Sequence, residues 1–177
     1  MSTSLVTELE LIAEELSSNS DGATQFSVAT LANRVAKHLG VRTDEVAILG
    51  LSNRWRHLHF LVPESLKHVG YIPLSSTSAL AARTARESRP EIVNNFAGIR
   101  HASVFESVKI DGEGAETIQK IISAPALVGE QVIGVIQISR KGSTAASAGP
   151  DFTTDDLAKL LAICRPLGKV IQRLTGE

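Results

Sequence analysis

Hydrophobic residues near the N-terminus recur at the spacing of a helix. Leu5, Leu9, Ile12 and Leu16 are separated by four, three and four positions, which places them on one face of an amphipathic helix. The polar segment 17–22 follows and predicts the end of this helix and a short linker.

Residues 27–40 predict a second helix. Ser27 is a suitable N-cap and Gly40 a suitable residue just past the C-terminus. The expected buried face consists of Val28, Leu31, Val35 and Leu39.

From residue 44 to residue 62 the pattern changes to two short apolar runs. A polar turn at 52–54 lies between them, which predicts two antiparallel strands. The first run contains Val46, Ile48 and Leu49, and the second contains Trp55, Leu58, Phe60 and Leu61.

Segment 70–96 predicts a short strand, a helix and another short strand. Pro73 keeps the first strand out of the centre of a sheet because proline has no N–H to donate. The helix begins at a serine or threonine cap within 76–78 and stops before Pro90. Residues 91–95 predict the second strand, and 96–117 is the least regular part of the chain.

A hairpin is predicted over 121–138, with its turn at 129–131. Pro125 is compatible with a strand position whose nitrogen faces no partner strand. Gly134 allows a helix or a neighbouring backbone to approach the sheet closely. The small-residue segment 141–151 predicts a loop.

The last helix begins after Thr153, with Asp156 as the acid of a capping box. Its apolar positions are spaced three, four, three, four and three, and they are Leu157, Leu160, Cys164, Leu167, Ile171 and Leu174. Leu161, Ile163 and Val170 widen this surface, and Pro166 predicts a kink. Packing on the chain's own sheet explains the seam alone. The N-terminal helix has no obvious partner, however, so we expect a homodimer through the terminal helices.

Composition indicates one globular domain with an aliphatic core, because 43% of residues are hydrophobic and only 4% aromatic. The formal charge of −1 gives no reason to expect nucleic acid or an anionic membrane as a partner. The N-terminus lacks the basic residues of a signal peptide, and no apolar run approaches the roughly 18 residues of a membrane span. These features favour a cytoplasmic protein.

Catalytic chemistry is not indicated. Cys164 is the only cysteine and lies on an apolar helix face, which favours an inert core thiol over a nucleophile. The chain contains no nucleophile elbow, P-loop or pair of catalytic carboxylates. We therefore expect no enzymatic activity.

A metal site is considered at His57 and His59, which share one face of a strand. His68 or His101 would supply the third ligand. Arg54 and Arg56 flank the pair, and this favours a solvated basic face. No metal site is predicted, and the cofactor, if the chain binds one, stays unknown.

Three segments resemble a known family: "YIPLSSTSALAARTARESRPEIVNN", "IISAPALVGEQVIGVIQISRKG" and "DFTTDDLAKLLAICRPLGKVI". They are similar to the corresponding segments of GAF domains, which are small-molecule sensor modules of signalling proteins. The resemblance extends over about residues 24–173. It divides the chain into an N-terminal helix and linker at 1–22 and a GAF-like domain at 23–177.

The resemblance implies an α+β fold of GAF/PAS-like type, with a central antiparallel sheet of about six strands. The N- and C-terminal helices would cover one face. Residues 71–117 would form a roof over a ligand pocket on the other face.

The function that the resemblance implies is that of a non-catalytic sensor. A small molecule would bind over the sheet, and the signal would pass through the terminal helices. A second hypothesis is a ligand-free module for dimerisation or protein interaction. A remote third is a free methionine sulfoxide reductase, whose chemistry needs more than one positioned cysteine. Cys164 also does not match the bilin-attachment position of phytochrome-like relatives.

Cyclic-nucleotide members of the family have a motif that this chain matches only in part. Lys141, Phe152 and Asp156 agree with it, whereas Arg140 and Leu157 replace an asparagine and a glutamate. The comparison therefore does not favour a cyclic nucleotide, and the ligand stays unidentified.

The ligand-binding residues that we expect lie between 74 and 96, and they are Ser75, Ser78, Leu80, Ala81, Asn94 and Phe96. The serines offer hydroxyls at a helix N-terminus, Leu80 and Ala81 lie where the family opens onto its ligand, and the last two supply polar and stacking contacts. An equal alternative is that the hydroxyls cap the helix and the alanine packs the core. Arg83, Arg86 and Arg89 predict a solvated face.

Overall fold

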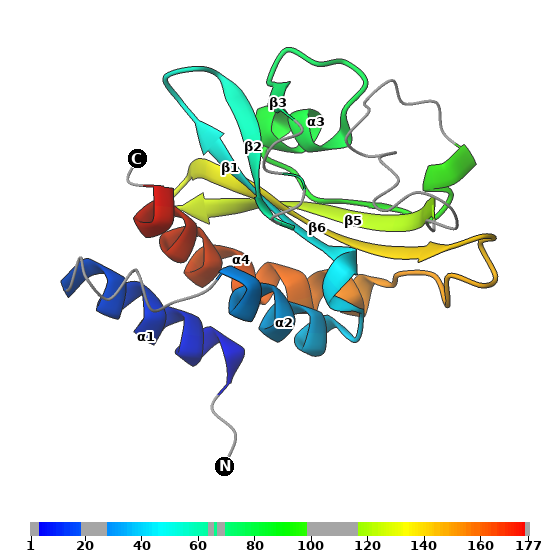
Figure 1. Ribbon diagram of the computed structural model, residues 1–177, viewed down its shortest axis with the longest axis horizontal. Coiled ribbons are helices and arrows are strands. Elements are labelled where there is room, and N and C mark those ends of the chain that lie inside the picture. Colours follow the sequence, from blue (N-terminus) through cyan, green and yellow to red (C-terminus); the bar gives the residue numbers. More distant parts are fainter. Residues whose placement is uncertain (1–3, 19–27, 64–65, 67–69, 99–116, 176–177) are drawn as a thin grey trace.

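A six-stranded antiparallel sheet forms the centre of the molecule (Figure 1). The computed structural model describes residues 4–18, 28–63, 66, 70–98 and 117–175. The strands are arranged in the order β3-β2-β1-β6-β5-β4. They are β1 (Val46–Ser52), β2 (His57–Val62), β3 (Tyr71–Pro73), β4 (Glu91–Val93), β5 (Thr117–Val128) and β6 (Gln131–Gly142).

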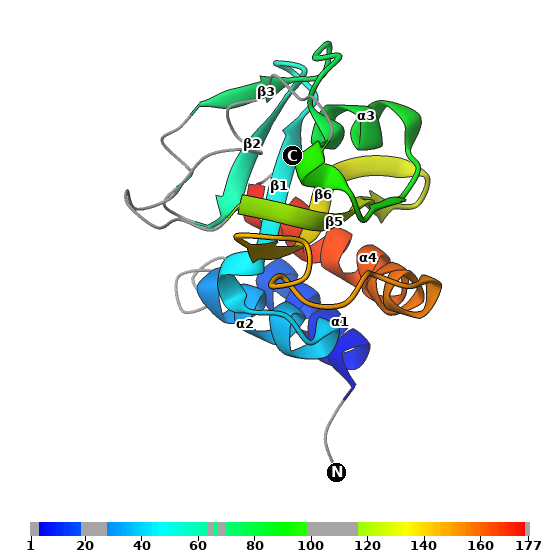
Figure 2. The same ribbon diagram turned by 90° about the vertical axis from the view of Figure 1, so that its right-hand side faces the viewer.

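Helices cover the two faces of the sheet unequally. Three lie on one face, which we call the helix face, and α3 lies on the other, which we call the roof face (Figures 1 and 2). The α-helices are α1 (Leu5–Ser18), α2 (Val28–Leu39), α3 (Leu80–Glu87) and α4 (Thr154–Thr175), and the 3-10 turns are η2 (Thr43–Glu45) and η4 (Phe96–Gly98). The predicted α+β class and layer order are confirmed.

The helix face is sealed by aliphatic packing. Side chains of β1, β5 and β6 meet those of α2 and α4 in one buried cluster, which includes Leu31, Val35, Ile48, Ile122, Ile136, Ile138, Leu160, Ile163, Leu167 and Ile171. Leu9 of α1 joins this cluster and is fully buried. The N-terminal stripe therefore has a partner within its own chain, namely α4, and it no longer argues by itself for a second copy.

The β5–β6 hairpin matches its prediction and adds one feature. Gly129 occupies the turn with φ +62°, a conformation that glycine adopts without strain. A bulge between Ala126 and Leu127 then shifts the register, so that Ser123 pairs with Gln137. Strand β4 pairs with β5 only as far as Ser123. Pro125 therefore lies beyond the end of β4. Its nitrogen has no hydrogen to donate, and β4 does not extend far enough to need that hydrogen bond.

Gly134 lies where β1 approaches β6, and it pairs with Gly50. A methyl group added at Gly134 would overlap the main-chain oxygen of Leu49. The predicted close approach of a neighbouring backbone is thus confirmed, and the neighbour is β1.

Helix ends follow the predicted signals at two sites. Gly40 has φ +69° just past α2. At α4, the Thr153 main-chain N–H donates to Asp156 Oδ2 at 2.8 Å, and the Asp156 N–H donates to Thr153 Oγ1 at 3.2 Å, which completes the capping box. Ser27 lies outside the described residues.

Two local predictions were wrong. Helix α3 has Ala79 at its N-cap position and no side-chain cap. Instead, Ser76 Oγ accepts a hydrogen bond from the Ala79 N–H at 3.2 Å, one step before the helix begins. Trp55 lies in the turn between β1 and β2 rather than in β2, and it is 66% exposed.

Among the described residues, no helix has both the length and the apolar character that crossing a bilayer requires.

Replacing Gly134 by alanine tests the close approach of β1 and β6. The added methyl group collides with main-chain atoms that cannot rotate away, so we expect Gly134→Ala to lower the free energy of unfolding by about 3 kcal/mol. Urea denaturation followed by circular dichroism measures this. Gly98→Ala is the matched control, because no atom lies within 4 Å of the added methyl group; equal losses in both variants would contradict the explanation.

Candidate functional site

The roof face of the sheet carries two separate apolar clusters. The larger one joins α3 to β1, β2 and β3, and it includes Leu49, Leu51, Leu58, Phe60, Ile72, Ala81, Ala82 and Val135. The smaller one consists of Leu80, Phe96 and Ile121, with Val93 and Ile118 partly buried beside it.

Between these clusters lies a set of buried polar side chains, which we call the polar stripe: Thr84, Ser123, Gln137 and Ser139. Their exposed fractions range from 0% to 5%. Ser123 and Gln137 pair across β5 and β6, and Ser139 pairs with Ile121. Thr84 reaches them from α3.

Hydrogen bonds join three members of the stripe. Thr84 Oγ1 lies 2.7 Å from Ser123 Oγ and donates to the Leu80 carbonyl at 2.9 Å. Gln137 Nε2 donates to Ser123 Oγ at 3.3 Å. Ser139 Oγ donates to the Glu45 carbonyl at 3.3 Å.

The expected ligand-binding residues are brought together only in part. Leu80 and Phe96 belong to the smaller cluster and are 5% and 4% exposed. Ala81 is fully buried in the larger cluster. Ser75 is exposed and Ser78 half-buried, and both lie in the turn before α3. Their roles in ligand binding stay predictions.

Asn94 has a structural role that local sequence did not reveal. Its Nδ2 donates to the Phe152 carbonyl at 3.1 Å, and its Oδ1 accepts from the Phe152 N–H at 2.9 Å. The side-chain amide thus binds both main-chain groups of a residue 58 positions away. It ties the segment after β4 to the beginning of α4.

The arginines Arg83 and Arg86 of α3 and Arg89 just after it are exposed, as predicted, and each has a partner. Arg83 forms a bidentate ion pair with Glu91, with both N–O distances at 2.8 Å. Arg89 pairs with Glu87 at 2.9 Å. Arg86 Nη1 donates to the carbonyls of Leu74 and Ser76 at 2.5 and 2.6 Å, and so it fixes the turn that contains Ser75.

The positions that correspond to the cyclic-nucleotide motif have structural roles. Phe152 is 3% exposed in the core of the helix face, and the Arg140 guanidinium lies 4.8 Å from the centre of its ring. Lys141 Nζ donates to the Asp44 carbonyl at 2.7 Å. Asp156 caps α4. That the chain does not bind a cyclic nucleotide stays a prediction.

His57 and His59 lie on one strand face as predicted, and each ring also packs against a residue of a neighbouring strand. The His57 ring stacks on Tyr71 with 4.1 Å between ring centres, and His59 packs over Gly50, its partner on β1. Both are therefore half-buried. Among the described residues, no group of three His, Cys, Asp or Glu side chains could hold a metal ion; His68 and His101 lie outside them.

Cys164 is buried on the helix face, with 3% of its surface exposed. Burial raises the pKa of its thiol from 9.0 to about 12, because the apolar surroundings penalise the thiolate. The predicted core thiol is confirmed. The sheet separates Cys164 from the polar stripe.

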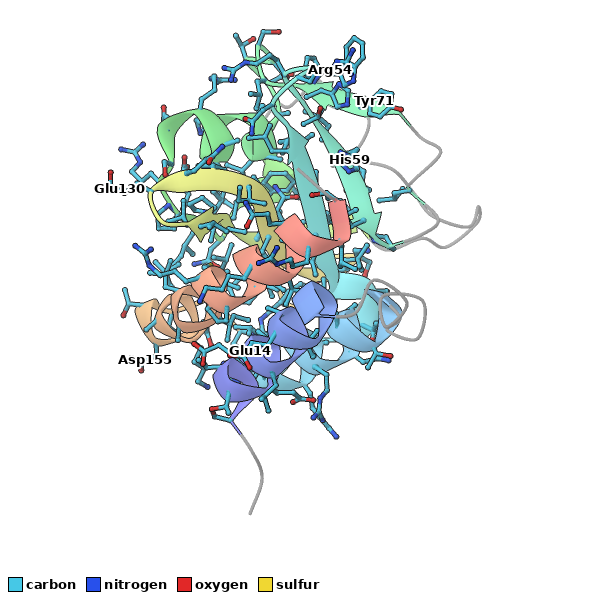
Figure 3. All side chains as sticks on the ribbon, turned by 90° about the vertical axis from the view of Figure 1, so that its left-hand side faces the viewer. Glu14, Arg54, His59, Tyr71, Glu130 and Asp155 are labelled. Atoms are coloured by element: carbon cyan, nitrogen blue, oxygen red, sulfur yellow. The ribbon has the colours of Figure 1, made fainter. Side chains whose placement is uncertain are left out.

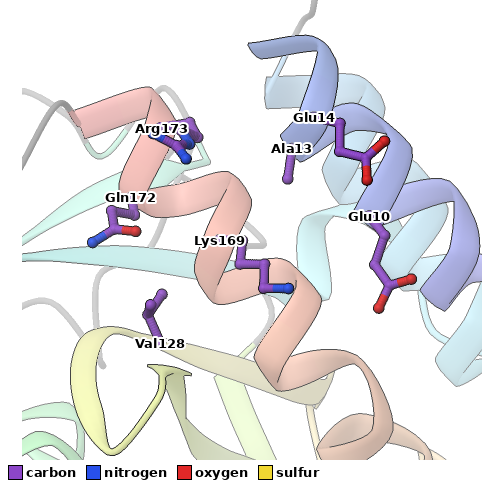
Figure 4. Close-up of a pocket in the computed structure, with 7 residues that line it drawn as sticks. All are labelled: Glu10, Ala13, Glu14, Val128, Lys169, Gln172 and Arg173. Carbon is purple, nitrogen blue, oxygen red and sulfur yellow. The ribbon is translucent and has the colours of Figure 1, made fainter. Parts of the chain in front are cut away.

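A groove of about 500 Å³ lies between α1, α4 and the end of β5. Figure 4 shows Glu10 and Glu14 on α1 opposite Lys169 and Arg173 on α4. Val128 of β5 lies below them. The two walls therefore carry opposite charge.

A family model described as "GAF domain" matches residues 27–171. The chain belongs to the GAF domain family. The six-stranded antiparallel sheet with its helices agrees with this family, and the family is typical of sensor and regulatory domains. A comparison with curated proteins finds no match.

Solved structures share the GAF fold at low sequence identity. The GAF domain of a phosphoenolpyruvate-protein phosphotransferase from Acinetobacter is 22% identical, with a TM-score of 0.64 and coverage of 99% of this chain and 97% of that chain. Residues 122 to 287 of a methyl-accepting chemotaxis protein are 14% identical, with a TM-score of 0.63 and coverage of 93% and 96%. A free methionine-R-sulfoxide reductase from Neisseria meningitidis, in complex with its substrate, is 16% identical, with a TM-score of 0.58 and coverage of 99% and 96%. These likenesses show the fold.

The pH dependence of stability tests the environment of Cys164. The thiol stays protonated in the folded state above pH 9.0, whereas it ionises in the unfolded chain. Its contribution is therefore complete below about pH 9 and decreases as the pH rises toward 12. Relative to Cys164→Ala, we expect the wild type to lose about 1 kcal/mol of unfolding free energy between about pH 8 and pH 10. Parallel stability curves for the two proteins would show that this thiol is not shielded.

Proposed function

We propose that this GAF domain is a non-catalytic sensor that binds a small molecule at the polar stripe and signals through α4 and α1. The ligand would lie between α3 and strands β5 and β6. The observation that carries the proposal is the buried set Thr84, Ser123, Gln137 and Ser139 on a sheet face that is otherwise apolar.

Buried polar side chains without partners are costly. An amide or hydroxyl removed from water loses about 1–3 kcal/mol unless a new partner replaces the solvent. Gln137 is 5% exposed, and its Nε2 donates to Ser123 Oγ. A ligand with an N–H or O–H group would add a donor to the Gln137 carbonyl.

The surroundings of the stripe favour a compact ligand with one apolar side. Leu80, Phe96 and Ile121 form an apolar surface next to Ser123 and Gln137. Such a combination, an apolar wall with a few directed polar groups, is typical of small-molecule sites. In this proposal Leu80 and Phe96 contact the ligand, as expected. Its polar contacts come from Gln137 and Ser123 rather than from Asn94.

Transmission would follow from the two sides of the same strands. Side chains of β5 and β6 alternate between the stripe and the core under α4. The Asn94 amide also fastens the segment after β4 to the start of α4. A ligand that favours one arrangement of β5 and α3 would therefore shift the population of α4 positions.

A non-catalytic role is supported by the lone thiol. Cys164 is the only cysteine of the chain, it is buried on the helix face, and its raised pKa keeps it protonated near neutrality. The sulfoxide reductases with this fold remain a weaker analogy for that reason. A reduced thiol also suits the cytoplasmic location that we propose.

A thermal-shift screen tests the sensor. The probes are a defined panel of nucleobases, nucleotides, haem and small organic acids, and we expect at least one to raise the melting temperature by about 3 °C or more. Gln137→Leu should abolish that rise, because it removes the amide at similar volume. Gln131→Leu is the control, since Gln131 is exposed at the start of β6. The sensor fails if no probe stabilises the protein or if both variants respond alike.

A second candidate is a module for dimerisation without a ligand. Leu11 on α1 and Leu161 on α4 are 53% and 42% exposed, which leaves apolar surface on both terminal helices. A second copy that packs there would cover it.

Light scattering after size-exclusion chromatography tests this second candidate. We expect a dimer in the wild type at about 100 μM, and a monomer after Leu11→Glu and Leu161→Glu are combined, because a buried unpaired carboxylate opposes association. A wild-type monomer at that concentration would exclude the dimer.

A further inference from the structure

The only tryptophan and the only tyrosine of the chain both lie on the surface. Trp55 is 66% exposed and Tyr71 is 62% exposed, whereas Phe60, Phe96 and Phe152 are each 5% exposed or less. In a chain with so few aromatic residues, burying Trp55 and Tyr71 would have added much to the core. Their exposure therefore requires another explanation.

These two residues belong to one surface. Trp55 lies in the turn 53–56 between β1 and β2, and Tyr71 begins the neighbouring strand β3. Figure 3 shows Arg54 and Tyr71 at the same end of the molecule, far from Glu14 of α1. We name the set Arg54, Trp55, Arg56, His57 and Tyr71 the aromatic–cationic patch.

Contacts within the patch hold its side chains in place. The Tyr71 ring stacks on His57 at 4.1 Å between centres, with 30° between the ring planes. The Arg54 guanidinium carbon lies 5.0 Å from the centre of the Trp55 ring, within the range of a cation–π interaction. Such prior order lowers the entropy that binding would otherwise cost.

The main chain below the patch is equally well defined. The Trp55 N–H donates to Ser52 Oγ at 3.3 Å, and the Leu74 N–H donates to the Arg56 carbonyl at 3.0 Å. Arg56 has φ +55°, which is uncommon for a residue with a side chain. A strained turn that displays large exposed side chains indicates selection for the display rather than for stability.

The patch carries the positive charge of Arg54 and Arg56. Arg54 and Arg56 form no ion pair with any carboxylate that the structure describes. Elsewhere on the surface, Arg34 pairs with Glu8, Arg83 with Glu91 and Arg89 with Glu87. The patch contains no acidic residue and no lysine.

Its composition is that of a protein-binding hot spot. Tryptophan, tyrosine and arginine are the residue types that carry most binding energy at protein interfaces, and aspartate, glutamate and lysine are depleted there. We propose that the aromatic–cationic patch binds an acidic segment of a partner protein, with carboxylates on Arg54 and Arg56 and an apolar side chain against Trp55.

Two alternative occupants fit less well. A nucleic acid strand needs a longer basic track than two arginines and a histidine, and the chain as a whole has a formal charge of −1. Addition of a partner strand to the edge of β3 is unfavourable, because β3 has only three residues and Pro73 lacks an N–H. Side chains, rather than main-chain pairing, would therefore carry the contact.

The patch and the polar stripe are separate surfaces, so this proposal does not depend on a ligand. It also leaves α1 and the beginning of α4 free, because Glu14 and Asp155 lie far from Arg54 and Tyr71 (Figure 3).

A peptide-display selection on the full chain tests the proposal without assuming a partner. The probe is a random twelve-residue library, and a synthetic peptide with the enriched consensus is then titrated against the protein. Trp55 is the only tryptophan, so its fluorescence reports binding at the patch itself. We expect consensus sequences rich in aspartate and glutamate, and a change in Trp55 emission that weakens with added salt.

Variants separate the patch from general electrostatics. Arg54→Glu combined with Arg56→Glu should weaken the consensus peptide at least about tenfold, and Tyr71→Ala should weaken it less. The control is Arg89→Glu, a single reversal of charge in the segment after α3, and this variant should bind as the wild type does. Circular dichroism confirms that each variant is folded.

Three outcomes overturn the proposal: a selection that enriches no acidic sequence, a consensus peptide that binds the double variant as well as the wild type, or a twelve-nucleotide oligo-dT that changes Trp55 emission at lower concentration than the peptide. The last result would assign the patch to single-stranded nucleic acid.

Discussion

The position of α4 depends on one contact without a side chain. Gly168 faces the main chain of Leu127 near the end of β5, and a methyl group there would overlap the Leu127 carbonyl. The helix consequently lies closer to the sheet than side-chain packing alone would allow. This contact positions the apolar side chains of α4. Leu160, Leu167 and Ile171 fill the core on the helix face, and α1 packs on the outer side of α4. At this point α4 contacts the main chain of β5 directly. No flexible side chain lies between them that could change rotamer when β5 moves, so a shift of β5 would also displace α4.

The two faces of the sheet have different chemistry, and the difference separates stability from recognition. On the helix face, β5 and β6 present mainly isoleucine and alanine to the core. On the roof face, the same strands present Ser123, Gln137 and Ser139. A fold that needed the sheet only as a scaffold would have apolar residues on both sides. The polar side chains are thus retained at a cost in stability, which is common where a protein binds something.

Much of this fold can be predicted from the sequence because its signals are local. The capping box of Thr153 and Asp156, the glycine after α2 and the alternation of the hairpin each depend on a few neighbouring residues. The register of the polar stripe is different. Counting from the turn at Gly129 would place Ser123 opposite Ile136, and only the bulge at Ala126 brings it opposite Gln137. Polar residues at 123, 137 and 139 within apolar strands were the available signal. These residues indicate that a polar side chain is present in the strand, but they do not indicate which residue it bonds to.

Interactions between distant segments explain the side-chain roles that the sequence did not indicate. Asn94 was expected to face a ligand, yet its amide is engaged by Phe152, which no pattern near residue 94 indicates. The histidines of β2 were expected to be solvated because arginines flank them. Their burial arises from Gly50 on one side and Tyr71 on the other, both of which belong to other strands. Sequence patterns gave the elements, and cross-strand packing decided what the individual side chains do.

Arg86 connects α3 to the end of β3. Its guanidinium holds the carbonyls of Leu74 and Ser76, and so it clamps the end of β3 to the last turn of α3. Helix α3 cannot slide along the sheet unless two charge-assisted hydrogen bonds break or the edge strand travels with it. Thr84 of the stripe belongs to the same helix, so α3 connects the stripe to the end of β3. A displacement of α3 at the stripe would therefore also displace the edge strand that begins at Tyr71.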